Sequence, residues 1–245
     1  MEEQTGVHSL GVDGCRGGWV GALWCAGAAG PQPLAAPTFD ELVAAARLAA
    51  ASRAVPRPDG IPVIAVDIPI GLPDSGPREA DRLARQALPG RASSVFSTLV
   101  RRAYEAEGYA AARAVSVELT GRSASAQAHA LGRKILEVDA WVRAHPATRV
   151  VDVHPEVCFA AMNGQVPIAP RKKTLAGMTA RRAALQASGM AVPDLPSSLR
   201  GVGDDDLLDA CAAVWTARRV AAGLARPMPD PPQVFSDGVP AAIWV

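Results

Sequence analysis

Two aspartates stand where strand-like segments end. Asp13 follows the apolar run 7–12 and precedes a glycine-bounded turn, and Asp67 ends the apolar run 61–66 before a proline and a glycine. An aspartate that opens a turn commonly bonds its own backbone, so Asp13 alone also fits a structural role. An unpaired buried carboxylate costs several kcal/mol, so Asp67 requires a cation, hydrogen-bond donors or a metal nearby. Both are candidates for chemistry, and structural pairing is the alternative for Asp67.

A third group of acids opens a helix predicted late in the chain. Residues 203–211 read Gly-Asp-Asp-Asp-Leu-Leu-Asp-Ala-Cys, in which Asp204 is a suitable N-cap. Acids in a first helical turn are favoured by the helix dipole. Asp209 is different, because it follows Asp206 by three residues and Asp205 by four, where like charges on one helix face repel. We therefore expect a cation against that face.

The three acidic positions together predict a cation site. Carboxylate oxygens are the hard ligands that Mg²⁺ and Mn²⁺ prefer. Two such ions about 3.5 to 4 Å apart can activate water and stabilise the leaving oxygen in phosphodiester cleavage. The segment 148–156 ends in further acids, so Glu156 or Asp152 would add a ligand from a neighbouring strand. For Glu156 the alternative is a solvated acid that follows a proline.

Five motifs resemble a known family by their joint presence and their order. They are Gly11-Val12-Asp13-Gly14-Cys15-Arg16-Gly17-Gly18-Trp19, Val66-Asp67-Ile68-Pro69-Ile70-Gly71-Leu72, Val153-His154-Pro155-Glu156, Lys172-Lys173-Thr174 and Asp205-Asp206-Leu207-Leu208-Asp209-Ala210. The set resembles the family of predicted ribonuclease-H-like nucleases, domain-of-unknown-function family 429, over nearly the whole chain. The sequence departs from the family pattern at Asp152, where glutamate is expected, and at Leu99, near an expected proline.

The resemblance implies a ribonuclease-H-like fold in which the acids are metal ligands. Asp13 would lie on the first strand, Asp67 on a later central strand, and Asp206 and Asp209 on the final helix. We predict these four as metal ligands for Mg²⁺ or Mn²⁺. The predicted catalytic residues are the same four together with Glu156, as a ligand or as a base behind the ligands.

Basic and hydroxyl side chains beside these motifs predict a surface for phosphate groups. Nucleic-acid backbones are commonly bound by such clusters. By contrast, the arginines of segment 78–85 alternate with acids and indicate an ordinary solvated helix face. The predicted substrate-binding residues are Arg16, Arg91, Ser93, Ser94, His154, Lys172 and Lys173.

The elements that must position these residues follow from periodicity and turn signals. Two apolar runs around a glycine-rich turn predict an antiparallel hairpin, and short apolar runs that end in polar groups predict buried strands. We expect one mixed α/β domain over residues 1–245, with the site beyond the carboxyl ends of the strands. The expected elements are strands 7–13, 19–25, 61–67 and 148–154, helices 38–53, 174–188 and 204–224, a helical insertion at 72–145 and a proline-rich tail.

Composition narrows the class of protein. With 245 residues, 49% hydrophobic and 20% charged, the chain is not of a disordered, collagen-like or coiled-coil type. The net charge of +1 indicates no global field for nucleic acid, which leaves a local basic surface. The sequence contains neither a membrane-length apolar run nor a signal-peptide pattern, so we expect no membrane association and a cytoplasmic location. Its cysteines and histidines have no metal-ligand spacing.

These patterns predict a metal-dependent phosphodiesterase, most simply a nuclease with a nucleic acid as its partner. One alternative is a phosphotransferase or ATPase of the actin and sugar-kinase type, whose glycine-rich first hairpin is similar. Those proteins have duplicated lobes, whereas this chain has one such hairpin. The other alternative is a non-catalytic nucleic-acid-binding or regulatory module.

Overall fold

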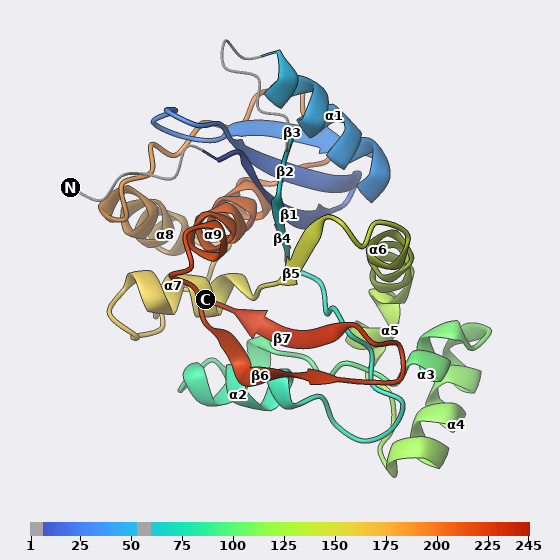
Figure 1. The fold of residues 1–245 in the computed structure, drawn as a ribbon. Helices are drawn as coiled ribbons and strands as arrows, with labels where there is room; N and C mark the ends of the chain where they lie inside the picture. Colours follow the sequence, from blue (N-terminus) through green and yellow to red (C-terminus); the bar gives the residue numbers. More distant parts are fainter. Residues whose placement is uncertain (1–6, 53–59) are drawn as a thin grey trace.

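The computed structural model describes residues 7–52 and 60–245, which form a mixed α/β fold around a seven-stranded sheet (Figure 1). The first two strands form the predicted antiparallel hairpin, and the strand after residue 60 runs parallel to the first. The mixed α/β class is therefore confirmed. In sheet order the strands are β3 (Gln32–Ala36), β2 (Gly18–Trp24), β1 (Ser9–Cys15), β4 (Val63–Val66), β5 (Arg149–Asp152), β7 (Pro240–Trp244) and β6 (Pro227–Val234).

Helices cover both faces of the first five strands (Figure 1). Helices α1 (Phe39–Ala51) and α6 (Gly132–Ala144) lie on one face, and α7 (Pro155–Met162), α8 (Leu175–Ala187) and α9 (Asp204–Ala221) lie on the other. Helix α9 runs directly over β1, because a Cβ atom at Gly11 would collide with the backbone of Ala210 and Val214. Glycine at this position lets the helix approach the strand closely.

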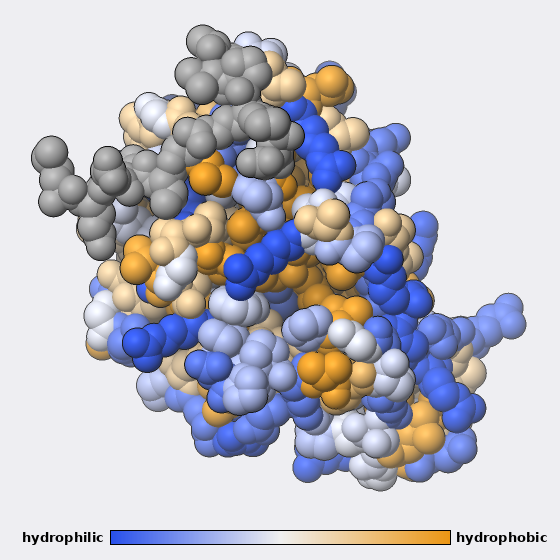
Figure 2. All heavy atoms as spheres, in the orientation of Figure 1, coloured by the Kyte–Doolittle hydropathy of each residue, from blue (hydrophilic) through white to orange (hydrophobic). Residues whose placement is uncertain are grey.

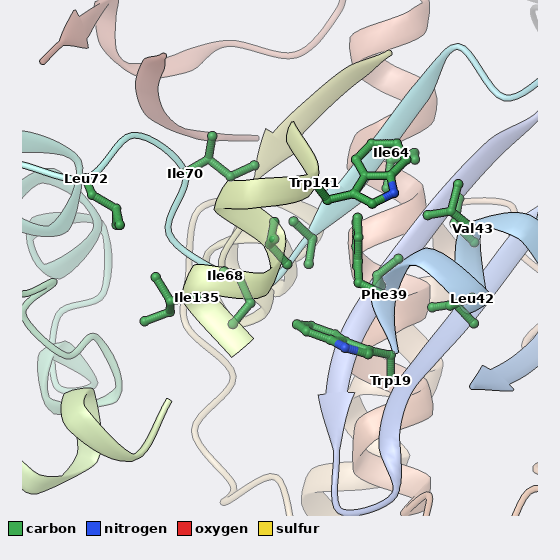
Figure 3. Close-up of a cluster of buried hydrophobic side chains, with 14 of the residues drawn as sticks. Trp19, Phe39, Leu42, Val43, Ile64, Ile68, Ile70, Leu72, Ile135 and Trp141 are labelled. Carbon is green, nitrogen blue, oxygen red and sulfur yellow. The ribbon is translucent and has the colours of Figure 1, made fainter. Parts of the chain in front are cut away.

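Alternation along the strands sorts their side chains between the two faces. Leu10 and Val12 of β1 pack on the α1 and α6 side, whereas Ala65 of β4 packs on the α9 side. On the α1 and α6 side, Phe39 makes edge contacts with Trp19 and Trp141, with ring centroids 5.5 and 5.3 Å apart (Figure 3). Residues two positions apart in a strand therefore point to the same face, which shows the face toward which a residue near the strand end points.

The interval 72–145 contains helices and no strand. Arg101 connects this interval to the C-terminal part of the chain, since its guanidinium group donates to Asp139 at 2.7 and 2.8 Å and to Asp237 at 2.8 Å. Its helices before α6 are α2 (Glu79–Ala87), the short 3₁₀ helix η1 (Ala92–Ser94), α3 (Arg101–Glu105), α4 (Gly108–Thr120) and α5 (Ala126–Ala130).

Two parts of the sheet were not expected from the sequence. The proline-rich tail, to which no strand was assigned, forms β6 and β7, and β7 joins the sheet beside β5 through the pair Asp152 and Ile243. The proline-containing segment 32–36 forms β3. Strands β3 and β6, which have prolines in their interior, lie at the sheet edges, where a residue without an N–H is tolerated, and β7 has its proline at its first residue, Pro240. Proline content alone therefore argued wrongly against strands here.

The helix starts at the site follow local capping chemistry. Thr174 is the N-cap of α8 and accepts a hydrogen bond from Gly177 at 3.1 Å. For α9 the N-cap is Gly203 and not Asp204, and the Gly203 N–H donates to Asp206 at 2.9 Å. Helix α7, which the sequence did not predict, begins at Pro155, a residue favoured in the first helical turn.

Two further expectations concern the chain as a whole. Among the described helices, none combines the length and the apolar character needed to cross a membrane. All four cysteines are buried. They pack within the two main hydrophobic clusters as small apolar residues.

Candidate carboxylate site

Asp13 and Asp67 lie side by side at the carboxyl ends of two adjacent strands. In the parallel pair β1 and β4, Val12 stands opposite Val66, and the Asp67 N–H donates to the Val12 carbonyl oxygen at 3.0 Å. Adjacent strands are about 4.8 Å apart. Asp13 lies two residues after Gly11, and Asp67 two residues after Ala65. Both acids therefore point to the face of the sheet that α9 covers.

Helix α9 adds Asp209 to these two strand-end acids. Asp209 is 2% exposed, and its charge interacts with those of both Asp13 and Asp67. Burial, followed by the charges of Asp67 and Asp209, raises the pKa of Asp13 well above its usual value. Burial and the charge of Asp209 raise the pKa of Asp67 in the same way. We call Asp13, Asp67 and Asp209 the carboxylate cluster.

Asp206 lies at the rim of the carboxylate cluster. It is partly buried, and its charge contributes to the raised pKa of Asp13. Burial raises the pKa of Asp206 itself, while the hydrogen bond from Gly203 acts in the opposite direction. One carboxylate oxygen of Asp206 is therefore engaged in capping α9.

The cation expected against this face of α9 is Lys172. Its Nζ donates to Asp209 Oδ2 at 2.6 Å and lies 3.8 Å from Asp205 Oδ2. Burial lowers the pKa of Lys172, but the charges of Asp209, Asp13 and Asp67 outweigh this effect and the net pKa is raised. For Asp209, burial prevails over Lys172 and raises the pKa to about 6.

Glu156 is engaged elsewhere. It is 7% exposed, and both of its carboxylate oxygens accept hydrogen bonds from Arg181 Nη2, at 2.6 and 2.8 Å. Arg181 is itself 1% exposed. Glu156 is thus neither a solvated acid nor a member of the carboxylate cluster, although its charge helps to raise the pKa of Asp67.

Asp152 points to the opposite face of the sheet. It stands beside Val66 in the pair β4 and β5, so its parity is that of Val66 and not that of Asp67. Asp152 accepts a hydrogen bond from Arg78 at 2.5 Å, and Arg78 also donates to Asp81 at 3.2 Å. Arg78 is 1% exposed, so the prediction of a solvated face was wrong at this residue. Burial raises the pKa of Asp152 to about 7, although Arg78 opposes the shift.

Arg91 donates hydrogen bonds to main-chain carbonyl groups of a distant segment. Its Nη2 donates to three consecutive carbonyl oxygens, those of residues 168, 169 and 170, at 2.8, 2.6 and 2.7 Å. The Ser94 hydroxyl donates to the Arg91 carbonyl oxygen at 2.8 Å, and His154 Nε2 contacts the Ser94 carbonyl oxygen at 3.3 Å. Burial lowers the pKa of His154. In this arrangement Arg91 holds the segment that precedes Lys172, while Ser94 and His154 contact the main chain around Arg91.

The remaining predicted substrate residues are open to solvent. Arg16, in the turn between β1 and β2, and Ser93 are exposed. The Lys173 side chain is 80% exposed and lies 3.8 Å from Asp205. These side chains could meet a ligand without a change in the fold.

Sequence reasoning missed Lys134, on α6. Its Nζ donates to the Gly18 carbonyl oxygen and lies 4.1 Å from the centroid of the Trp19 ring. Burial lowers the pKa of Lys134, while nearby acids, Asp13 and Asp206 among them, act in the opposite direction. Nothing in its local sequence pattern signals its place near Asp13 and Asp206, because Lys134 is separated from each of these two acids by more than 70 residues.

The fit of a divalent cation rests on donor chemistry. The carboxylate cluster offers hard oxygen ligands, and Asp209 Oδ1 is buried without a hydrogen-bond partner. Within residues 7–52 and 60–245, however, no three His, Cys, Asp or Glu side chains converge closely enough to hold a metal ion as they stand. The donor types fit Mg²⁺ or Mn²⁺, and Lys172 holds the position beside Asp209 Oδ2.

The larger hollows of the described part of the chain lie away from the carboxylate cluster. One of about 780 Å³ is lined by residues of β5, the end of α6 and the turn before β7, and another of about 410 Å³ lies near Val7 and Pro62. Figure 2 shows hydrophobic residues in the middle of this face, where β5 and β7 lie in Figure 1. A small pocket of about 20 Å³ touches Asp67, Arg78 and His154.

The comparison with known proteins adds one finding to this geometry. The family model described as "Protein of unknown function (DUF429)" matches residues 11–234. No curated protein matches the chain, and no solved structure does. The matched range covers most of the chain and includes the carboxylate cluster and Lys172, and the chain therefore belongs to the DUF429 family.

Proposed function

We propose that this protein is a metal-dependent phosphodiesterase that cleaves nucleic acid, with the carboxylate cluster as its cation site. One observation carries the proposal. Asp13, Asp67 and Asp209 come from three separate segments and meet at the carboxyl ends of β1 and β4. In the described part of the chain none of them forms an ion pair with an arginine. Glu156 and Asp152, close by, each have a buried arginine partner.

Mutual repulsion makes such a cluster unfavourable without a cation. Burial in the first place, and then the charges of the neighbouring acids, raise the pKa values of Asp13 and Asp67, so the fold favours their neutral forms. A divalent ion that binds only the native state would offset the cost. Asp13, Asp67 and Asp209 would hold it, with Asp206 at the rim. When bound, the ion would supply a Lewis acid and an activated water for phosphodiester hydrolysis.

A polymeric substrate is favoured by the surroundings of the cluster. Arg16 and Lys173 are exposed beside it, where they can bind phosphate groups outside the cation site. The fold also has an antiparallel first hairpin, a parallel β4 and a late helix that brings acids to the strand ends, an arrangement compatible with the proposal. The exposed cations support a nuclease over an enzyme for small nucleotides, whereas the hairpin is compatible with both.

The test is a cleavage panel of single-stranded, duplex, branched and hybrid nucleic acids with Mg²⁺ or Mn²⁺. Wild-type protein should cleave at least one substrate class, and Asp67→Asn should lose the activity. Asp204→Asn is the matched control, because Asp204 is an exposed acid on the same helix as Asp209 and should leave cleavage unchanged. Tight binding or hydrolysis of nucleoside triphosphates, with no cleavage of any polymer, would favour the phosphotransferase alternative instead.

A further inference from the structure

Lys172 is placed among the acids by the fold. Its ammonium group is 2.6 Å from Asp209 Oδ2, and it interacts electrostatically with Asp13 and Asp67 as well. Its neighbour Lys173 is 80% exposed; it lies 3.8 Å from Asp205, and its charge also acts on Asp206. Two adjacent lysines therefore occupy different environments, and only Lys172 faces the whole carboxylate cluster.

The segment before Lys172 is anchored from two directions. Arg91 donates to three of its carbonyl oxygens, and the buried Arg181 donates to the Pro170 carbonyl oxygen at 3.2 Å. Gly177 in α8 packs directly on this segment, because a Cβ atom there would collide with the Arg171 carbonyl group. These contacts fix the backbone, so Lys172 approaches Asp209 from a defined direction.

The carboxylate that Lys172 binds still has one oxygen atom free to bind a cation. Asp209 is 2% exposed, and its Oδ1 atom is buried without a hydrogen-bond partner. A single ammonium group neutralises one charge, whereas the cluster has three carboxyl groups. When all three are ionised, the lysine alone neutralises the site incompletely.

We propose that Lys172 is the internal cation of the carboxylate cluster and competes directly with a divalent ion for Asp209. This inference rests on the proposed cation site. In the absence of the ion, Lys172 bonds to Asp209 and reduces the repulsion within the cluster. Binding of the ion requires the ammonium group to leave Asp209 Oδ2, so Lys172 weakens the affinity for the ion and limits how often the site is loaded.

The competition is tested by Mn²⁺ affinity, measured without nucleic acid from the electron paramagnetic resonance signal of free Mn²⁺. The proteins are wild type, Lys172→Met, Lys172→Gln and Lys173→Met. Removal of the competing ammonium group should tighten Mn²⁺ binding about tenfold in both Lys172 variants, which is within the usual range of coupling between ligands. Lys173→Met, which removes the same charge from the adjacent residue, should change the affinity by less than about threefold, given the screening of exposed charges.

The same variants, without metal, show whether Lys172 stabilises the cluster. Lys172→Met should lower the melting temperature, and this loss should be smaller in an Asp209→Asn background, because the ion pair is then already absent. Unchanged or weaker Mn²⁺ binding in the Lys172 variants would overturn the competition. Equal tightening in Lys173→Met would also overturn it, since a general charge effect would then suffice. No Mn²⁺ binding by any of the proteins would instead remove the cation site and this inference together.

Discussion

Two sets of acids lie close together in this protein and are neutralised in different ways. Glu156 and Asp152 are buried and are each paired with an arginine that is almost fully buried. Asp13, Asp67 and Asp209 face one another, and a lysine contacts only one of them directly. The first set resembles ordinary structural ion pairs, whereas the second leaves negative charge uncompensated.

The difference shows which observation separates structural acids from candidate ligands. Asp13, Asp67 and Asp152 all lie at the ends of apolar strands, and Glu156 and Asp209 both lie on helices, so type and position do not distinguish the two sets. The partner does. A buried charge that has its own counter-charge is expensive to disturb and is not available to bind a ligand. In the described part of the chain, Asp13 and Asp67 have no such partner and Asp209 is paired only with the partly exposed Lys172, so these three acids are available for a cation.

The largest effect is expected where an arginine-paired acid loses its partner. Arg181→Met leaves Glu156 buried without a counter-charge, which should lower the free energy of unfolding by about 3–5 kcal/mol in urea denaturation. Arg182→Met is the control, because Arg182 lies on the same helix and is 3.8 Å from a fully exposed aspartate. A loss of less than about 1 kcal/mol for Arg181→Met would place this pair among weak surface interactions.

An opposite effect is expected when an acid of the carboxylate cluster is neutralised. Asp67→Asn should raise the melting temperature of the metal-free protein, because it removes repulsion, with about 2–4 °C for each kcal/mol gained. It should also remove most of the further rise that Mn²⁺ produces in the wild type. Differential scanning calorimetry with and without Mn²⁺ measures both. If Asp204→Asn gave the same two changes, the effect would not be specific to the cluster.

A smaller effect concerns pH and the arginine-paired set. One buried arginine, Arg78, is shared by Asp81 and Asp152, and burial raises the pKa of Asp152 to about 7. An unfolded aspartate has a pKa of about 3.9, so the fold favours the protonated form. The stability that Asp152 contributes is therefore fully present below about pH 4 and is lost as the pH rises to about 7.

The variant Asp152→Asn, which cannot ionise, makes this measurable. Urea unfolding between pH 4 and 8 should show the wild type losing stability relative to the variant as pH rises, with no further change above about pH 7.5. Asp194→Asn, at a fully exposed position, should show no such trend. A constant difference between the wild type and Asp152→Asn across the range would contradict the raised pKa.

The smallest effect is expected at the exposed lysine. If Lys173 contacts one phosphate, Lys173→Ala should flatten the slope of log affinity against log salt for an oligonucleotide by about one unit. Fluorescence anisotropy of a labelled strand at several salt concentrations measures this slope. Arg113→Ala, which removes an exposed charge from α4 in the 72–145 interval, should leave the slope unchanged.

Much of the candidate site could be predicted from local sequence. Asp13 and Asp67 each follow a short apolar strand, and the parallel register of β1 and β4 places the two strand ends together. The repulsion among the acids of α9 correctly indicated a cation against that helix, which is Lys172. These inferences needed only the strand pattern and the helix spacing.

The rest depended on partners that are distant in the sequence. Glu156 is paired with Arg181, 25 residues away, and Asp152 with Arg78, 74 residues away. The sequence around each acid does not indicate its arginine partner. The face toward which Asp152 points depends on the register of β5 beside β4. The edge strands β3 and β6 were missed because their prolines argue against a strand, whereas an edge position tolerates them.

The most direct test of the central claim is Mn²⁺ binding, measured by isothermal titration calorimetry, for single variants from both sets of acids. Asp13→Asn, Asp67→Asn and Asp209→Asn should each weaken the affinity by at least about tenfold, or 1.4 kcal/mol. Asp152→Asn and Glu156→Gln, in samples that circular dichroism shows to be folded, should bind Mn²⁺ as the wild type does. Retained binding in the first three variants, with loss in either of the last two, would contradict the account.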